Sequence, residues 1–353
     1  MSETTVSVGL PDGLRGVPTT EVPETKKTFT SDQEVRWCPG CGDYVILAAV
    51  QGFLPTLGLK RENIVFVSGI GCSSRFPYYL DTYGMHSIHG RAPAIATGLA
   101  SSRPDLSVWV VTGDGDALSI GGNHLIHALR RNVNLTILLF NNRIYGLTKG
   151  QYSPTSELGK ITKSTPFGSL DAPFNPVSLA LGAEATFVAR TIDSDRAHLT
   201  AVLSAAAAHR GTSLVEIYQN CNIFNDGAFD LLKSPETRDS MLIRLEHGQP
   251  VRFGADLEFG VRRSAAGVLD VAAGDDPDVV VHDAYAADPS QAFALSRLAD
   301  PGSLARSPIG IFRQVERATY GDLMADQLDE DVEKRGRGDL AGLLAGTDPW
   351  TVE

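Results

Sequence analysis

The sequence lacks the features of several protein classes. None of its 353 residues belongs to an apolar run near the 18 or so residues that a membrane-spanning helix needs. The N-terminus also lacks the basic and apolar regions of a secretory signal. We therefore expect a cytoplasmic protein with no membrane partner.

Basic residues are in deficit, since 42 acidic against 31 basic residues give a formal charge of −11. This charge repels nucleic-acid phosphates, so nucleic acid is not an expected partner.

Cysteine is scarce as well. The chain has four cysteines, which are too few and too scattered for the disulfide framework of a small secreted domain. Cys38 and Cys41 form a CxxC pair in "RWCPGCGDYV", whereas Cys72 and Cys221 stand alone. We expect all four to be free thiols or ligands.

The order of apolar segments predicts an α/β fold. Between about residues 36 and 245, short β-branched runs closed by Gly, Asn or Asp alternate with helical patterns. The runs indicate buried strands at 64–69, 106–115, 134–142, 183–190 and 212–220. The helical patterns span 43–54, 92–102, 121–131 and 196–210. This alternation predicts a doubly wound, mostly parallel sheet.

The composition divides the chain into three regions. Residues 1–33 are rich in Thr, Glu, Pro and Ser without a period, which predicts a flexible arm or a segment ordered only against a partner. Residues 34–245 carry the α/β pattern. Residues 246–353 are charged and rich in Asp and Ala, and their one strand-like run is "VVVH". We expect a mostly helical or irregular C-terminal extension there, packed on the core or on another subunit.

The most specific motif is "GDGDALSIGGNHLIHALRRNVNLTILLFNN", residues 113–142. A predicted strand ends in its Gly-Asp-Gly, a helix follows, and the next strand ends in an Asn pair. Because the carboxyl ends of parallel strands meet at one edge of a sheet, Asp114 and Asn142 are expected to lie close together. Their side-chain oxygens and the carbonyl oxygen of Ile144 suit Mg²⁺, which commonly joins protein ligands to a bound diphosphate.

The spacing of this motif identifies its ligand. Gly-Asp-Gly is a common turn and means little alone. Here 25 residues, 116–140, separate it from the Asn pair, which is the thiamine-diphosphate signature. The glycines let the main chain approach a diphosphate, whose charge the following helix N-terminus offsets. The sequence therefore predicts a thiamine-diphosphate site with Mg²⁺.

Three interpretations of the cysteines compete. Cys38 and Cys41 alone suit a thioredoxin-like redox pair. All four suit zinc or a [4Fe–4S] cluster, and spacing does not separate these two, while inert buried thiols remain open for Cys72 and Cys221. The predicted cofactor favours the cluster. A 2-oxo acid that loses CO₂ on thiamine diphosphate leaves electrons that an oxidant can remove, and zinc has no redox chemistry.

Seven segments together resemble a known family. They are "WCPGCGDY", "GIGCSSR", "HGRAPAIATG", "GDGDALSIGGNH", "NNRIYGLTKGQYSPT", "NCNIFND" and, at 307–313, "SPIGIFR". In this order they resemble the beta subunit of the 2-oxoacid:ferredoxin oxidoreductases, over about residues 35–235. "YGLTKGQ" is more similar to the 2-oxoglutarate-type enzymes than to the pyruvate-type ones.

The resemblance implies roles for individual residues. The [4Fe–4S] ligands are Cys38, Cys41, Cys72 and Cys221. The Mg²⁺ ligands are Asp114, Asn142 and the carbonyl of Ile144. The residues around the diphosphate are Gly113, Gly115 and Asp116. Those near the organic part of the cofactor are Ile70, Gly71 and His89, with His89 the candidate catalytic residue. Arg91 and Lys149 are candidate contacts for an anionic substrate or coenzyme A, and a local structural role stays open for both.

The resemblance also implies an activity and partners. A 2-oxo acid, by this reading 2-oxoglutarate, is decarboxylated on thiamine diphosphate, coenzyme A takes the acyl group, and the cluster passes electrons to ferredoxin. The partner is an alpha, or fused gamma-alpha, subunit in a heterotetramer of two alpha and two beta chains. The glutamate that activates the cofactor belongs to that alpha subunit, so this chain alone is predicted to be inactive.

Two other functions remain open at the level of the sequence. One is a non-oxidative thiamine-diphosphate decarboxylase or synthase in which the cysteines hold structural zinc. The other is a non-catalytic cofactor-binding subunit.

Overall fold

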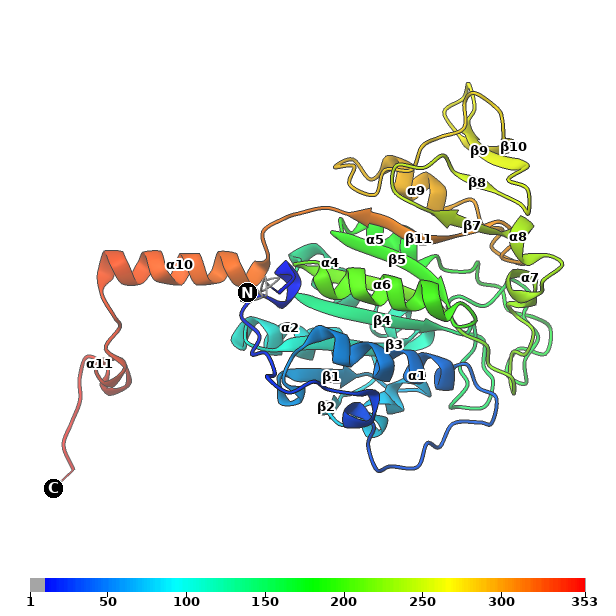
Figure 1. The fold of residues 1–353 in the computed structure, drawn as a ribbon. Coiled ribbons are helices and arrows are strands. Elements are labelled where there is room, and N and C mark those ends of the chain that lie inside the picture. Colours follow the sequence, from blue (N-terminus) through cyan, green and yellow to red (C-terminus); the bar gives the residue numbers. More distant parts are fainter. Residues whose placement is uncertain (1–9, 353) are drawn as a thin grey trace, which may run out of the picture.

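A computed structural model describes residues 10–352 and contains one eight-stranded sheet (Figure 1). The strands are β1 (Ile64–Ser68), β2 (Tyr83–His86), β3 (Ser107–Gly113), β4 (Leu135–Asn141), β5 (Phe187–Ile192), β6 (Thr212–Tyr218), β7 (Leu242–Leu245) and β11 (Ser307–Gln314). Their order is β2-β1-β3-β4-β6-β5-β11-β7. The first six run parallel to one another, and β11 is antiparallel to β5 and parallel to β7. The predicted mostly parallel α/β sheet is confirmed.

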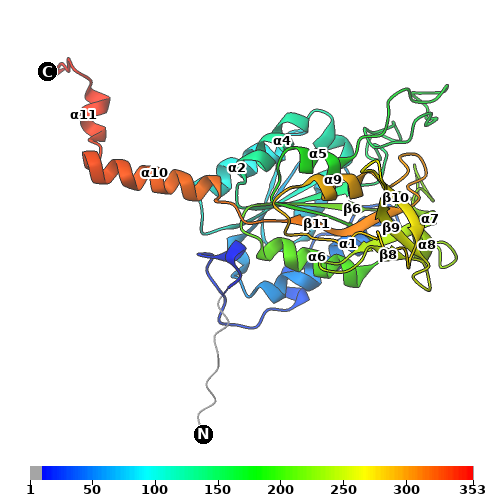
Figure 2. The ribbon, with the colours of Figure 1, turned by 90° about the horizontal axis from the view of Figure 1, so that it is seen from above.

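Helices cover both faces of this sheet (Figure 2). One face carries α1 (Asp43–Phe53) and α6 (Arg196–Ala208). The other carries α2 (Ala92–Ser102), α4 (Gly122–Arg131), α5 (Pro176–Gly182) and α9 (Ser290–Ser296). Three short helices lie in the connections: α3 (Asp114–Leu118), α7 (Asp230–Lys233) and α8 (Arg238–Met241). Among the residues that the structure describes, no helix has the length and apolar character needed to cross a membrane.

Alternate side chains of the central strands build two separate cores. Phe66 of β1 and Trp109 of β3 are buried against α1 and α6. Their neighbours Val65 and Val110 are buried against α2 and α4 on the opposite face. Because successive side chains of a strand point to opposite faces, a strand covered on both sides must be apolar throughout. This explains why the central strands appear in the sequence as continuous apolar runs.

The predicted elements agree with the structure in the central part of the chain. The strands predicted around 64–69, 106–115, 134–142 and 212–220 correspond to β1, β3, β4 and β6. The strand predicted at 183–190 is displaced, since β5 covers Phe187–Ile192. Its first predicted residues form the turn after α5, where Glu184 has a left-handed φ of 60°.

The C-terminal region differs from the mostly helical extension that we expected. It contains β11, which lies within the main sheet, and a small antiparallel sheet of β8 (Arg252–Phe253), β9 (Phe259–Arg263) and β10 (Leu269–Ala273). The run "VVVH" makes only isolated bridges. Helices α10 (Tyr320–Arg335) and α11 (Leu340–Ala345) extend away from the body of the molecule (Figure 1). The division at residue 245 stays a prediction.

The N-terminal segment also differs from the expected flexible arm. Residues 1–9 of that arm lie outside the described residues. The remainder forms two 3₁₀ turns, η1 (Asp12–Leu14) and η2 (Lys26–Phe29). Leu14, Val17 and Phe29 are buried in the core beside α1 and α6. Single apolar residues without a period can therefore attach an irregular segment to the core.

A buried ion pair joins β5 to β6. Arg190 Nε donates to Glu216 Oε2 at 2.6 Å, and Asn141 Nδ2 donates to Glu216 Oε1 at 2.7 Å. The Arg190 side chain is 2% exposed and that of Glu216 is fully buried. The two residues are partners in the ladder between the strands. Each charge therefore depends on the other, because neither reaches water.

We expect Arg190→Met to lower the free energy of unfolding by about 3–5 kcal/mol, because it leaves the Glu216 charge buried without its partner. Urea unfolding of the purified protein measures this change. The control is Lys334→Met, which breaks an exposed pair with Glu330 on α10 and is expected to leave the unfolding midpoint unchanged. Equal midpoints for both variants would contradict a structural role of the buried pair.

Candidate functional site

The carboxyl ends of the parallel strands meet around one cleft of about 80 Å³. The turns after β1, β3 and β4 line it, and His89 reaches it from the loop after β2. Its lining residues are Ile70, Gly71, Cys72, Ser73, His89, Gly113, Asp114, Gly115, Asp116, Phe140, Asn142, Ile144, Tyr145, Gly146, Leu147 and Thr148. All eight residues predicted to bind the cofactor are among them. The structure therefore brings these predicted residues together.

Asp114 is the first residue after β3, and its carboxylate is buried. Ser153 Oγ and Thr155 Oγ1 both donate to its Oδ2, at 2.5 and 2.6 Å. Burial raises the pKa of Asp114 to about 6, although these two hydrogen bonds favour the charged form. Backbone hydrogen bonds from Gly115 and Asp114 also favour the charged form. The two hydroxyls hold the carboxylate in a fixed orientation through Oδ2.

The two asparagines after β4 have different surroundings. Asn141 points into the protein, where its amide nitrogen binds Glu216. Asn142 lines the cleft, and its Oδ1 accepts a hydrogen bond from the backbone N–H of Ile144 at 3.1 Å. Arg143 between them and Ile144 has a left-handed φ of 59°. This turn directs Asn142 and Ile144 toward the same cleft as Asp114.

Asp116 joins three of the turns that line the cleft. Its Oδ1 accepts hydrogen bonds from the backbone N–H groups of Ile70, at 3.2 Å, and Gly90, at 2.7 Å. Its Oδ2 accepts from Thr112 Oγ1 at 2.6 Å, and His89 Nδ1 lies 2.7 Å from Oδ1. Both oxygens are therefore engaged within the protein. The carboxylate acts on the cleft by fixing the turns after β1 and β2.

Two glycines border the cleft, and the absence of a Cβ has a different effect at each. A Cβ on Gly115 would lie 2.2 Å from the ring of Tyr145, whose hydroxyl donates to the Gly115 carbonyl at 2.8 Å. Gly71 has a φ of 137°, and no atom lies within 4 Å of the position that its Cβ would take. The first glycine allows a close contact between two loops, and the second borders open space at the cleft.

The cysteines belong to three loops, and hydrogen bonds join the CxxC loop to each of the other two. Trp37 Nε1 donates to the Cys72 carbonyl at 2.7 Å, and Gly42 N donates to the Asn220 carbonyl at 3.1 Å. A Cβ on Gly146 would lie 3.5 Å from Cys72 Sγ and 3.7 Å from Cys221 Sγ. These two sulfurs therefore border the same backbone position. Cys72 also lines the cofactor cleft.

Burial and nearby negative groups disfavour free thiolates in this region. Burial is the main cause that raises the pKa of Cys72 to about 12, and negative neighbours such as Asp43 add to it. Burial also raises the pKa of Cys41. Within residues 10–352, no three His, Cys, Asp or Glu side chains are gathered closely enough to hold a single metal ion. A four-iron cluster spreads its ligands around a cube, so its cysteines lie farther apart than those of one ion. Four soft sulfur donors suit that group, and their ligation stays a prediction.

The contacts of three other predicted residues do not assign them a role in the cleft. His89 is 39% exposed and lines the cleft beside Asp116. Arg91 does not line the cleft, and its guanidinium contacts His124 Nε2. Lys149 is also absent from the lining and has a left-handed φ of 73°. The roles of Arg91 and Lys149 with substrate stay predictions.

Sequence reasoning missed several residues of this region. Tyr145, Ser153 and Thr155 contact Gly115 or Asp114, although "NNRIYGLTKGQYSPT" contains all three. Their hydroxyls depend on the path of a loop, which has no periodic signal. Of these residues, only Tyr145 had a signal in the sequence, because it lies three residues after Asn142.

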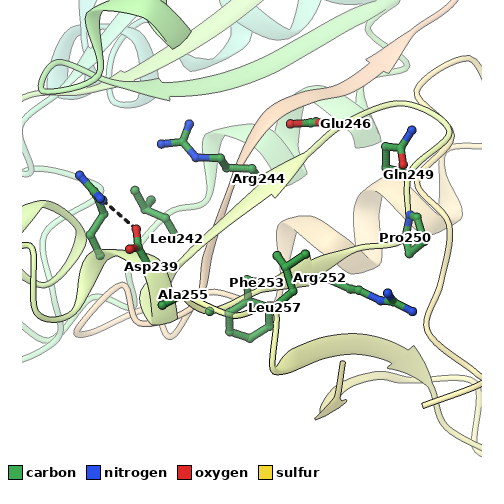
Figure 3. A pocket seen from close by; sticks show the side chains of 12 residues that line it. Asp239, Leu242, Arg244, Glu246, Gln249, Pro250, Arg252, Phe253, Ala255 and Leu257 are labelled. Atoms are coloured by element: carbon green, nitrogen blue, oxygen red, sulfur yellow. Dashed lines mark hydrogen bonds and ion pairs between the residues drawn. The ribbon is translucent and has the colours of Figure 1, made fainter. Parts of the chain in front are cut away.

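A second groove, of about 530 Å³, lies beside β7, β8 and α8 (Figure 3). Arg238, Arg244 and Arg252 line it, but the first two pair with Asp239 and Asp195. None of the predicted site residues lines this groove. It therefore does not compete with the cleft as the candidate site.

The segment of the chain that forms the cleft matches a protein-family model. Residues 69–217 match the family model described as the thiamine pyrophosphate enzyme, C-terminal TPP binding domain. This range includes the turns after β1, β2, β3 and β4. The predicted thiamine-diphosphate-binding domain is thereby confirmed.

We expect Asp116→Asn to weaken thiamine-diphosphate binding about tenfold or more. The amide cannot accept all of the hydrogen bonds that the carboxylate accepts, and one lost bond to a buried charge costs about 1.5–3 kcal/mol. Isothermal titration calorimetry with thiamine diphosphate and Mg²⁺ measures the affinity. The control is Asp105→Asn, whose carboxylate is 40% exposed and pairs with Arg103 at the surface. Wild-type affinity in Asp116→Asn would contradict the positioning role.

Relatives with known names share most of the chain. The 2-oxoglutarate oxidoreductase subunit KorB of Mycobacterium tuberculosis is 66% identical over 343 residues, which cover 96% of this chain and 91% of that protein. The 2-oxoacid:ferredoxin oxidoreductase subunit beta of Saccharolobus solfataricus is 45% identical over 54% of this chain and 63% of that protein. A solved structure of 2-oxoglutarate:ferredoxin oxidoreductase from Magnetococcus marinus has a TM-score of 0.75 and 32% identity, covering 94% of this chain and 100% of that one. The chain therefore belongs to the family of beta subunits of the 2-oxoacid:ferredoxin oxidoreductases.

Proposed function

We propose that this chain is the thiamine-diphosphate-binding beta subunit of a coenzyme A-dependent 2-oxoglutarate:ferredoxin oxidoreductase. The relative with 66% identity carries the name of a 2-oxoglutarate enzyme. The Magnetococcus marinus structure was solved with 2-oxoglutarate, coenzyme A and succinyl-CoA bound. The observation that carries the proposal is that Cys72 lines the cofactor cleft while its sulfur and that of Cys221 border Gly146. A redox group bound to these thiols would therefore be adjacent to a cofactor in the cleft.

The cleft fits a diphosphate with Mg²⁺. Asp114 presents one carboxylate oxygen that the Ser153 and Thr155 hydroxyls leave unused, and Asn142 and Ile144 reach the cleft from the turn after β4. Asp114, Asn142 and the Ile144 carbonyl are hard oxygen donors of the kind that Mg²⁺ prefers. We propose that these three hold the metal and that Gly113 and Gly115 border the diphosphate. Thiamine diphosphate, when bound, supplies the carbanion chemistry that removes CO₂ from a 2-oxo acid.

The protein groups have distinct tasks in this arrangement. The Ser153 and Thr155 hydroxyls fix the orientation of Asp114, so the metal ligand needs no reorganisation when the metal binds. Asp116 holds the turn at Ile70 and the turn at Gly90 against the cleft. His89 borders the cleft with part of its ring accessible, so it can position a proton or a substrate group there. Its catalytic role stays a proposal.

The four cysteines supply the redox part of the proposal. We propose that Cys38, Cys41, Cys72 and Cys221 ligate a [4Fe–4S] cluster, which supplies one-electron transfer toward ferredoxin. Hydrogen bonds join the CxxC loop to the loops of Cys72 and Cys221. The donor set consists of soft sulfur atoms, which select iron–sulfur clusters or zinc over hard cations.

The proposal includes a partner subunit. The family defines this chain as one subunit of a larger enzyme, and no glutamate lines the cleft within residues 10–352. We propose that an alpha, or fused gamma-alpha, subunit supplies that glutamate and that two copies of each chain form the enzyme.

We expect the chain combined with its alpha subunit to reduce ferredoxin or methyl viologen only when 2-oxoglutarate and coenzyme A are both present. Each chain alone is expected to show background rates, because neither contains the complete site. Anaerobic viologen reduction measures the rates, with pyruvate as the comparison substrate. Activity of the isolated chain, or decarboxylation without viologen reduction, would contradict the proposal and favour a non-oxidative thiamine enzyme.

We expect the anaerobically purified wild-type protein to be brown and to lose its colour with dithionite. Cys221→Ser is expected to lower the iron content to a small fraction of the wild-type value, because it removes one of four ligands. Iron analysis and visible absorption measure this. The control is Ser74→Ala, a buried residue two positions after Cys72, which is expected to keep the iron. A colourless wild-type protein that contains zinc would remove the redox mechanism.

A further inference from the structure

One buried side chain, that of Gln219, contacts a cysteine. Gln219 directly follows β6 and is 1% exposed. Its Nε2 donates to Cys41 Sγ at 3.2 Å and to the Asn220 carbonyl at 2.9 Å. Cys41 lies 178 positions earlier in the chain. The contact therefore joins the CxxC loop directly to the end of the sheet.

The partners of Gln219 determine how its amide is oriented. A backbone carbonyl can only accept a hydrogen bond, so the atom that faces the Asn220 carbonyl must be the amide nitrogen. The amide group has two N–H bonds, and the second is directed at Cys41 Sγ. Exchanging the nitrogen and oxygen would place two acceptors against each other. The orientation in which the amide nitrogen donates to the sulfur is therefore the one that satisfies both contacts.

The surrounding backbone keeps the amide at this position. Gln219 N donates to the Asn141 carbonyl at 3.0 Å, which extends the ladder between β4 and β6. A Cβ on Gly42 would lie 2.8 Å from Gln219 Cγ and 2.3 Å from Asp193 Oδ2. Glycine at position 42 therefore lets the CxxC loop approach closely enough for the contact. With 1% exposure, the side chain is enclosed by the surrounding protein.

We propose that Gln219 is a positioning residue that raises the reduction potential of the iron–sulfur cluster by donating a hydrogen bond to the sulfur of Cys41. This inference rests on the proposed ligation of a cluster by Cys41. Reduction adds negative charge that spreads onto the ligand sulfurs, so an N–H donor stabilises the reduced state more than the oxidised state. Hydrogen bonds to the sulfurs are among the factors that set cluster potentials.

The test compares Gln219→Met with the wild type in the anaerobically purified complex with the alpha subunit. Methionine keeps a similar volume and removes both N–H donors. We expect a lower midpoint potential in an EPR-monitored redox titration, with unchanged iron content. The matched control is Gln51→Met, because Gln51 is also buried but donates to the Tyr79 carbonyl at 3.0 Å. This control is expected to keep the wild-type potential.

A second measurement uses isotope labelling of the glutamine side chains. Wild-type protein labelled with ¹⁵N in the glutamine side-chain amide is expected to show a weak ¹⁵N coupling to the reduced cluster in pulsed EPR. An unlabelled sample identifies the background. Loss of this coupling in labelled Gln219→Met assigns it to residue 219.

The outcomes separate this inference from the proposed function. A wild-type complex without iron overturns both. A wild-type complex that contains the cluster, with an unchanged midpoint in Gln219→Met or with no ¹⁵N coupling, overturns only the role of Gln219. A lower midpoint in Gln51→Met as well would assign the change to general destabilisation and also overturn it.

Discussion

The parallel pairing of β1, β3, β4 and β6 is the constraint on which the site depends. Parallel strands end at the same edge of a sheet, so the turns that follow them meet although they are far apart in the sequence. Cys72 follows β1, Asp114 follows β3, Asn142 follows β4 and Cys221 follows β6. A different strand order or an antiparallel strand among these four would separate the side-chain oxygens of Asp114 and Asn142 from the sulfurs. The fold class therefore limits which chemistry the chain can carry.

Buried charges connect this edge to the centre of the protein. Thr155 Oγ1 lies within hydrogen-bond distance of Asp114 Oδ2 and of Asn141 Oδ1, at 2.6 and 2.8 Å. Asn141 in turn donates to Glu216, which pairs with Arg190. A buried carboxylate is costly unless donors surround it, so the protein must order these donors to keep Asp114 ionised. One series of side-chain contacts therefore links the ion pair of the sheet to the Asp114 carboxylate in the cleft.

Much of this arrangement could be predicted from the sequence, for two physical reasons. Strands covered on both faces are continuous apolar runs, and a diphosphate site needs glycines and hard oxygens at the ends of such runs. The missed features depend on contacts between distant segments. β11 contains Pro308 and Gly310, which weaken a strand pattern, yet β5 and β7 flank it on both sides. Ser153 and Gln219 make hydrogen bonds from loops to residues far away in the sequence, and no local periodicity marks such residues.

In the proposed enzyme, a diphosphate cofactor and a four-cysteine iron site share one edge of the sheet. Anomalous X-ray scattering at the iron absorption edge, from crystals of the anaerobically prepared complex, tests this arrangement. We expect one iron peak surrounded by the sulfurs of Cys38, Cys41, Cys72 and Cys221, with diphosphate density beside Asp114. Iron bound elsewhere, or four cysteine sulfurs without iron next to an occupied cofactor site, would contradict it.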